Sequence, residues 1–147
     1  MCIRDRRDAA ARADIGVLAA ANFALGMALF TMIVEDAARR FSGHPSFAAW
    51  IHEWHHAAKK DAPSGTALQL DAALRRAGYE GVSVSSTRGG FVPGTHEVSF
   101  DAVAETITLT HTVRDRTVFA RGALEAAAWL VGRRGWFTIE DLVRDRR

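Results

Sequence analysis

Cysteine is almost absent from this chain, since Cys2 is the only one among 147 residues. A single thiol excludes a disulfide framework and a cysteine-based zinc site, and a reducing, cytoplasmic setting becomes the default expectation. The net charge is also small, +2 at pH 7, which is too little to favour a nucleic-acid partner. Internal repeats and low-complexity tracts are absent as well. With 48% hydrophobic and 24% charged residues, the composition is that of one soluble, globular domain.

Residues 15–34 lack charged side chains, and Arg4, Arg6, Arg7 and Arg12 precede them. The length and the basic flank would suit a signal anchor or a signal peptide. Against this, Asn22, two glycines and many alanines make the run only weakly hydrophobic. A buried strand followed by an amphipathic helix is the alternative interpretation.

The hydrophobic pattern predicts an α+β fold, a mixed β-sheet with flanking helices. Helices are expected at 24–41, where Asn22 can act as the N-cap, from Ser64 or Thr66 to Gly78, and at 117–133. Strands are expected at 15–20, 82–87, 96–100 and 105–113, followed by a short closing segment at 136–144. Residues 47–60 are ambiguous, because their aromatic residues have helical spacing but also suit a strand.

The segment from Glu53 to Ala67 holds the densest set of chemically useful side chains. His55 and His56 can transfer protons near neutral pH, and Lys59 can bind or protonate an anion. Pro63 ends any preceding helix, and Ser64-Gly65-Thr66 opens a new one, whose backbone N–H groups can bind a carboxylate or a phosphate. Ser64 would also serve as a simple N-cap, but the nearby histidines and lysine favour an anion-binding site.

The same segment overlaps a possible zinc motif, since residues 52–56 match H-E-x-x-H. In that interpretation His52 and His56 would bind zinc and Glu53 would be the general base. The motif requires a helix, so that both histidines face one metal. The extended metzincin form would need Gly and His where this chain has Lys59 and Ala62.

The remaining candidates are weaker. His44 lies in a predicted turn and His96 and His111 in predicted strands, where hydrogen-bonded structural roles are expected. Arg116 belongs to a charged turn, yet its guanidinium is suited to binding an anionic substrate.

Residues 53–67, with the pattern E-x-H-H-x-x-K-x-D-A-P-S-G-T-A, closely resemble the signature of the dihydrodipicolinate reductase family of bacterial lysine biosynthesis. Three further stretches resemble segments of this family in the same order: the cofactor-contacting hinge at 20–26, the strand leading to the oligomer sheet at 88–100, and the return to the nucleotide domain at 109–123. The resemblance covers roughly residues 15–143.

This resemblance implies a cytoplasmic, homotetrameric reductase that transfers a hydride from NADPH or NADH to 4-hydroxy-tetrahydrodipicolinate, a cyclic dicarboxylate, without nucleic acid, membrane or metal. It implies that His55 is the catalytic proton donor or acceptor and Lys59 its partner acid. The implied substrate-binding residues are His56, Ser64, Gly65, Thr66 and Arg116, and the implied cofactor-binding residues are Ala20, Ala21, Asn22 and Phe23. A lysine and a helix N-terminus suit a dianionic substrate.

The sequence departs from the family in one respect: the G-x-G-x-x-G fingerprint of a Rossmann domain is missing. We therefore expect four parts: a non-native leader or Rossmann remnant at 1–14, the last Rossmann strand and hinge at 15–23, the substrate-binding and oligomerisation domain at 24–116, and the return helix at 117–147. On this basis the chain is expected to bind NADPH poorly and not to turn over substrate. A zinc hydrolase and a non-catalytic assembly domain stay as alternatives.

The resemblance also bears on the two open questions of secondary structure. It predicts that 47–56 is mostly strand, which would exclude the zinc motif. It predicts strand, hinge and helix for 15–34 in place of a membrane span.

Overall fold

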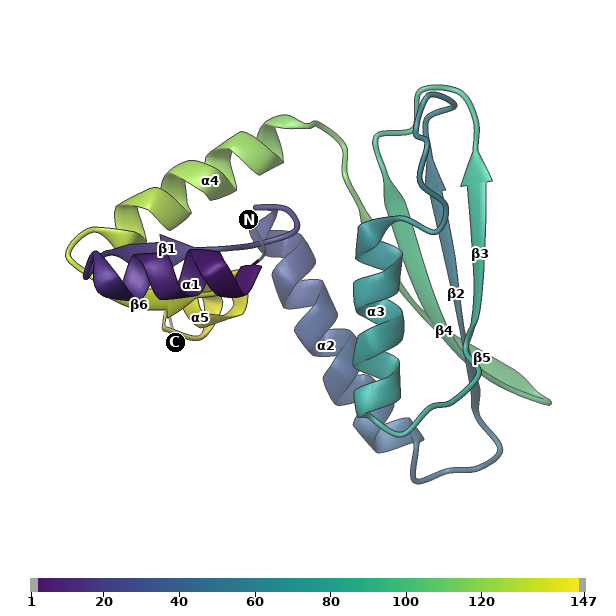
Figure 1. Cartoon of the computed structure of the whole chain (residues 1–147). Coiled ribbons are helices and arrows are strands. Elements are labelled where there is room, and N and C mark those ends of the chain that lie inside the picture. The colour runs from purple at the N-terminus through teal and green to yellow at the C-terminus, as the bar shows by residue number, and fades with distance from the viewer. Residues whose placement is uncertain (1–2, 146–147) are drawn as a thin grey trace. The chain divides into compact units, whose positions relative to one another are not determined.

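The computed structural model describes residues 3–145 (Figure 1). Its elements, in chain order, are α1 (Ile3–Arg12), β1 (Gly16–Leu18), α2 (Leu25–Phe41), β2 (Ala48–His55), α3 (Gly65–Arg76), β3 (Ser83–Arg88), β4 (Thr95–Ala102), β5 (Glu105–Thr112), α4 (Thr117–Leu130), β6 (Gly135–Phe137) and α5 (Ile139–Asp145). The chain divides into two compact units. The first combines the residues up to Ala28 with those from Thr117 onward, and the second is Leu29–Arg116.

The second unit is built on a four-stranded mixed sheet with the strand order β3-β2-β4-β5. Strand β2 pairs in parallel with β3 and antiparallel with β4, and β4 pairs antiparallel with β5. A parallel pair needs a crossover connection, which α3 supplies between β2 and β3. The predicted α+β class with a mixed sheet is therefore confirmed.

Side chains alternate across this sheet, and α3 and the part of α2 from Leu29 onward lie along one face of it (Figure 1). On β2, Ile51, Glu53 and His55 are buried, whereas the residues between them are partly exposed. Phe100 of β4 is fully buried and stacks on Phe41 of α2, with 4.5 Å between ring centroids. The helix-covered face is thus the core of the unit, and it includes two ionisable side chains of β2.

Helix α3 has the boundaries that its sequence predicts. Ser64 is the N-cap, and its Oγ accepts a hydrogen bond of 3.1 Å from the backbone N–H of Ala67. After Arg76 the chain reaches Gly78, whose φ of +101° lies in the left-handed region that favours glycine and ends helices. The cap fixes the start of α3 directly after the loop that carries Lys59.

The first unit packs α4 and α5 around a short parallel pair of strands, β1 and β6. Its core contains Ala28, Ala126, Ile139 and Leu142. Gly122 of α4 approaches the loop before α2 so closely that a Cβ atom there would lie 1.6 Å from the carbonyl oxygen of Phe23. No residue with a side chain fits at this position without movement of the backbone.

The remaining predictions of secondary structure are confirmed apart from small shifts at element ends. Residues 48–55 form a strand, as the family resemblance predicts, and 15–34 form β1, a loop and the first part of α2. The sequence did not predict helix α1. Within residues 3–145, none of the helices combines the length and the apolarity needed to cross a membrane.

Candidate active site

The candidate site forms on the helix-covered face of the sheet, near the end of β2. Glu53 and His55 lie two residues apart on this face, because alternate residues of a strand share a side. The register of the sheet pairs Glu53 with Ser86 of β3 and with His96 of β4, and it pairs His55 with Arg88. Segments more than thirty residues apart in the chain therefore meet at one carboxylate and one imidazole.

Glu53 is fully buried, and both of its carboxylate oxygens are engaged. Oε1 accepts hydrogen bonds from Ser86 Oγ at 2.6 Å, from Arg88 Nη2 at 2.6 Å and from the backbone N–H of Ser64 at 3.2 Å. Oε2 lies 2.5 Å from Nδ1 of His55. Burial alone would raise the pKa of Glu53, but the bonds from Ser86, Arg88 and Ser64 and the nearby His55 lower it to about 2.

His55 is neutral at neutral pH, because its pKa lies below the usual value. Burial is the main cause, the charges of Lys59 and Arg88 act in the same direction, and Glu53 opposes them. The Nε2 side of the ring faces Gly94, where a Cβ atom would lie 3.1 Å from Nε2. The φ of Gly94 is +145°, which also favours glycine. A side chain at position 94 would therefore crowd the Nε2 edge of the His55 ring.

His96 connects this pair to the start of α3. Its Nε2 lies 3.3 Å from Ser64 Oγ, and its ring meets the ring of His55 edge to face at 5.1 Å between centroids. Burial, and after it the proximity of His55, lowers the pKa of His96 to about 4. His96 is therefore neutral, and the hydrogen-bonded structural role expected for it agrees with this position.

Lys59 lies in the loop between β2 and α3, where it forms a salt bridge with Asp61. Its Nζ is 2.7 Å from Oδ1 and 3.0 Å from Oδ2 of that carboxylate. The pKa of Asp61 lies below its usual value, chiefly because of this contact, and the backbone N–H of Gly65 contributes in the same direction. The ammonium of Lys59 thus already binds one carboxylate in the loop that leads into α3, and this carboxylate belongs to the chain itself.

The loop is held by backbone and side-chain contacts to the end of β3. Arg88 Nη2 donates to the carbonyl oxygen of Asp61 at 2.6 Å, in addition to its bond with Glu53. Gly89 N–H donates to the carbonyl oxygen of His55 at 3.0 Å. Arg88 consequently fixes the loop and the buried carboxylate together, a role that nothing in the local sequence indicated.

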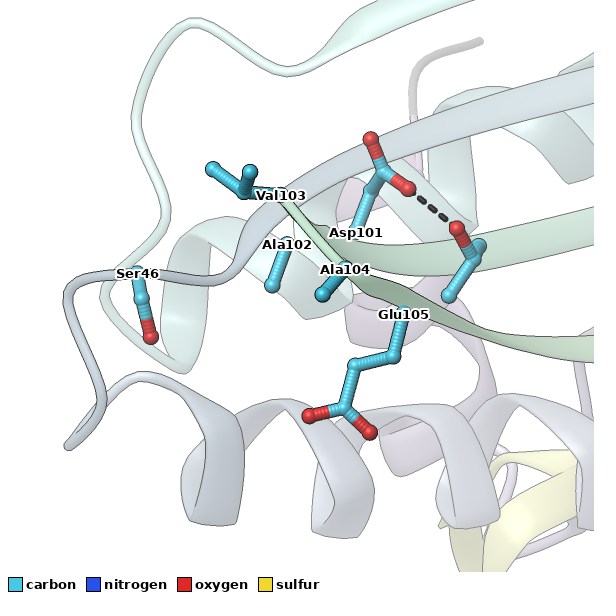
Figure 2. Close-up of a pocket in the computed structure, with 7 residues that line it drawn as sticks. Ser46, Asp101, Ala102, Val103, Ala104 and Glu105 are labelled. Atoms are coloured by element: carbon cyan, nitrogen blue, oxygen red, sulfur yellow. Dashed lines mark hydrogen bonds between the residues drawn. The ribbon is translucent and has the colours of Figure 1, made fainter.

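Two further predicted substrate-binding residues, His56 and Arg116, line a pocket together with Phe91, Pro93, Arg114 and Asp115. Another pocket lies at the opposite end of β4 and β5, around their connecting turn (Figure 2). It presents the carboxylates of Asp101 and Glu105, and Thr106 donates a hydrogen bond to Asp101. The pocket at His56 has two arginines and suits an anion, whereas the acidic pocket of Figure 2 does not.

The predicted cofactor-binding residues, Ala20 to Phe23, lie in the first unit, in the loop between β1 and α2. Asn22 Oδ1 accepts a hydrogen bond of 3.0 Å from the backbone N–H of Ala24, one residue before α2 begins. Asn22 therefore forms an Asx turn before the helix, and the N-cap position predicted for it is occupied by Ala24. The loop offers backbone and amide groups and no cation, which suits an uncharged carboxamide better than a phosphate.

The zinc motif at residues 52–56 is wrong, because these residues lie in and directly after a strand. In an extended chain, His52 and His56 would be about 13 Å apart, which is too far for both to bind one metal ion. His52 instead bonds Thr87 Oγ1 at 3.0 Å and stacks on Trp54. The zinc hydrolase alternative thereby loses its ligand geometry.

One group of potential metal ligands occurs in the described part of the chain, namely Glu53, His55 and His96. Its carboxylate already binds the guanidinium of Arg88 at 2.6 Å. A divalent cation bound there would be repelled by that charge, and Oε2, the oxygen that faces the two histidines, already lies 2.5 Å from Nδ1 of His55. The arrangement therefore suits proton transfer rather than metal binding.

Because the pKa of Glu53 is lower in the folded chain than its ordinary value, the free energy of unfolding should fall over a defined range of acidic pH. The contribution is present above the ordinary value of 4.5 and is lost as the pH falls from there towards 2. A shift of this size corresponds to about 3 kcal/mol. Urea denaturation between pH 6 and pH 2 should show this loss in the wild-type chain and a clearly weaker pH dependence in Glu53→Gln. Equal pH profiles for the two proteins would contradict the assignment.

Comparison with known proteins agrees with this geometry. The family model described as "Dihydrodipicolinate reductase, C-terminus" matches residues 26–143. The chain belongs to this family. The match includes the whole second unit, all of α4 and β6 and most of α5, and it confirms the resemblance inferred from residues 53–67.

Individual relatives lead to the same family. The chain is 45% identical over 136 residues to the 4-hydroxy-tetrahydrodipicolinate reductase of Stenotrophomonas maltophilia (strain R551-3), covering 92% of this chain and 55% of that protein. It is 40% identical over 161 residues to the enzyme of the same name from Anaplasma marginale (strain St. Maries), covering 95% and 61%. The chain thus spans little more than half the length of these curated relatives.

Among solved structures, the dipicolinate-bound dihydrodipicolinate reductase from Paenisporosarcina sp. TG-14 matches with a TM-score of 0.75. The alignment covers 92% of this chain and 57% of that protein, at 22% sequence identity. The likeness shows that the two chains share a fold.

Proposed function

We propose that this chain supplies the dicarboxylate-binding and proton-transfer part of a reductase acting on 4-hydroxy-tetrahydrodipicolinate. The observation that carries this proposal is the salt bridge between Lys59 and a carboxylate in the loop that leads directly into α3, next to the buried Glu53–His55 pair. The names of the relatives and the dipicolinate bound to the structural neighbour support the same substrate class.

The carboxylate of Asp61 indicates what the loop binds. A substrate carboxylate would replace it and accept hydrogen bonds from Lys59 and from the N–H groups at the start of α3. A Cβ atom added at Gly65 would have no neighbouring atom within 4 Å, so the approach to its backbone is open. Thr66 and His56 would complete the contacts to the carboxylates, and Arg116, from its pocket with His56, is a further candidate. Ser64 is buried, and its Oγ and N–H are engaged within the chain, so it would contribute by capping α3 and not by direct contact.

Proton transfer is assigned to His55 and Lys59. When bound, the dinucleotide supplies the hydride, and reduction of the ring also consumes one proton. Lys59 carries that proton as an ammonium, while the neutral His55 can accept or relay it through Nε2. Ala20 to Phe23 would hold the nicotinamide end of NADPH or NADH through backbone and amide groups.

Isothermal titration of the chain with dipicolinate, the planar analogue of the substrate, tests the binding part. We expect the wild-type chain to bind and Lys59→Met to bind about 10-fold to 100-fold more weakly, because a hydrogen bond to a charged group contributes about 1.5–3 kcal/mol. Asp61→Asn should bind more tightly than the wild type, since it removes the competing carboxylate.

Lys60→Met is the matched control, because Lys60 is an exposed neighbour of the same charge. It should change the affinity little. If Lys60→Met weakened binding as much as Lys59→Met, the effect would be one of net charge and not of the site. If the folded wild-type chain bound no dipicolinate, the proposed function would be wrong.

We also propose that the uncovered face of the sheet mediates assembly into a homotetramer, which would act in the cytoplasm. Both helices of the second unit lie on the other face, while Trp50 and Trp54 lie on this one among exposed serines and threonines of β3 and β5. Sedimentation equilibrium of the chain would measure the assembly, and Trp54→Glu should shift it towards the monomer. A wild-type chain that stays monomeric at high concentration would contradict this proposal.

A further inference from the structure

We infer that Glu53 is a positioning residue for His55. Its Oε2 accepts a hydrogen bond from Nδ1–H of the imidazole, and Nε2 is left as the atom that exchanges a proton with the substrate. The last part of this inference rests on the proposed function, whereas the orientation and the protonation of the ring do not.

Oε2 of Glu53 and Nδ1 of His55 have only each other as possible hydrogen-bonding partners within the described residues. Both atoms are buried. They lie 2.5 Å apart, closer than the roughly 2.7–2.9 Å of an ordinary charge-assisted N–H···O bond, and two lone pairs would repel each other at this distance. Buried polar atoms are rarely left unpaired, because the cost of desolvation is not recovered. The contact therefore requires one proton between Nδ1 and Oε2.

The donors around Oε1 determine which atom carries that proton. Three donors hold Oε1: Ser86 Oγ, Arg88 Nη2 and the N–H of Ser64. They keep the carboxylate ionised at neutral pH, where the pKa of Glu53 of about 2 is far below the solvent pH. An ionised carboxylate can only accept, so the proton belongs to Nδ1.

The surroundings of His55 disfavour a doubly protonated ring. His55 faces the carboxylate of Glu53, the cations Lys59 and Arg88, and the neutral ring of His96. Burial and the two cations outweigh Glu53, and the pKa of His55 stays below its usual value. At neutral pH the ring has one proton, which Glu53 fixes on Nδ1, and Nε2, on the ring edge beside Gly94, keeps its lone pair.

The fixed carboxylate also links two parts of the site. Through Oε1 it binds the backbone of the N-cap Ser64, and through Oε2 it orients His55. A single side chain thereby sets the position of the proposed carboxylate-binding helix end and of the proton-exchanging nitrogen. The local sequence gives only a weak indication of this role, namely the spacing of two residues between Glu53 and His55 on one strand face.

The test is nitrogen-15 NMR of the chain labelled at histidine, near neutral pH, with the His55 signals assigned by their loss in His55→Asn. Long-range nitrogen–proton correlations identify the protonated nitrogen. We expect Nδ1–H for His55 in the wild-type chain. An Nε2–H tautomer, or a ring exchanging freely between both, would overturn the inference without any variant being needed.

The variant Glu53→Gln provides the second measurement. The three donors at Oε1 require an oxygen there, so the carboxamide must turn its NH₂ group towards His55. An NH₂ group donates, and the protonated nitrogen of His55 is expected to switch from Nδ1 to Nε2. Retention of Nδ1–H in a folded Glu53→Gln chain would contradict the inference.

Glu97→Gln is the matched control, because Glu97 lies on the opposite face of the sheet and loses the same charge. It should leave the tautomer of His55 as in the wild type. Dipicolinate titration of the same samples separates the proposed function from the role of Glu53. A wild-type chain that has Nδ1–H but binds no dipicolinate refutes the proposed function alone. A wild-type chain that binds dipicolinate but has the Nε2–H tautomer refutes the role of Glu53 alone.

Discussion

Replacing Arg88 with methionine is expected to lower the free energy of unfolding by about 3 to 5 kcal/mol, since it leaves a buried charge without its partner. Arg88 and Glu53 form an ion pair of 2.6 Å in which the carboxylate is fully buried and the guanidinium largely so. Methionine can fill much of the space of the arginine stem, so packing is the smaller part of the loss. Urea denaturation at pH 7 measures the effect.

The double variant Arg88→Met with Glu53→Gln identifies the cause. If the uncompensated carboxylate is responsible, neutralising it should restore part of the stability, and the double variant should be more stable than Arg88→Met alone. Arg75→Met is the surface control, because Arg75 is 58% exposed and its pair with Asp71 is worth at most about 1 kcal/mol. Equal losses for Arg75→Met and Arg88→Met would contradict the assignment.

Local patterns in the sequence predicted most of the elements. Helix α3 is an example, because Ser64 as the N-cap and Gly78 after the last turn are signals within the segment itself. Strand β5 is another, since its threonines alternate with Ile107, Leu109 and His111. Such signals depend only on neighbouring residues, so they can be recognised in the sequence without knowledge of tertiary contacts.

The segment that became β2 shows where local patterns fail. Phe47, Trp50, Ile51 and Trp54 have helical spacing, yet β3 and β4 pair with this segment on both sides and make it a central strand. The choice depends on partners distant in the chain. The resemblance to the family predicted the strand correctly because it carries that distant information.

The candidate site divides along the same line. His55, Lys59 and Ser64 were predicted, because they lie within one short signature. Ser86 and Arg88 were not, since only the parallel register of β2 and β3 brings them to Glu53. Glu53 received a role only in the zinc alternative, which requires a helix where the chain is extended. The residues that hold the site together are therefore those that the sequence alone did not indicate.

A second large effect is expected for Gly122→Ala, with a loss of about 3 kcal/mol or more from the stability of the first unit. Alanine is a better helix former than glycine by about 1 kcal/mol, so the intrinsic preference of α4 would favour the change. The geometry opposes it more strongly. The new Cβ would lie 1.6 Å from the carbonyl oxygen and 2.8 Å from the carbonyl carbon of Phe23, and a backbone group cannot rotate away as a flexible side chain can.

Thermal unfolding followed by near-ultraviolet circular dichroism would measure the loss, because Trp129 and Phe137 of this unit pack edge to face and report its order. Gly65→Ala is the matched control: no atom lies within 4 Å of its added Cβ, and its stability should change by less than about 1 kcal/mol. If Gly122→Ala were as stable as the wild type, α4 could not lie as close to Phe23 as the structure places it. The close approach would then no longer explain the glycine, and the proposed position of the nicotinamide-binding loop against α4 would have to change with it.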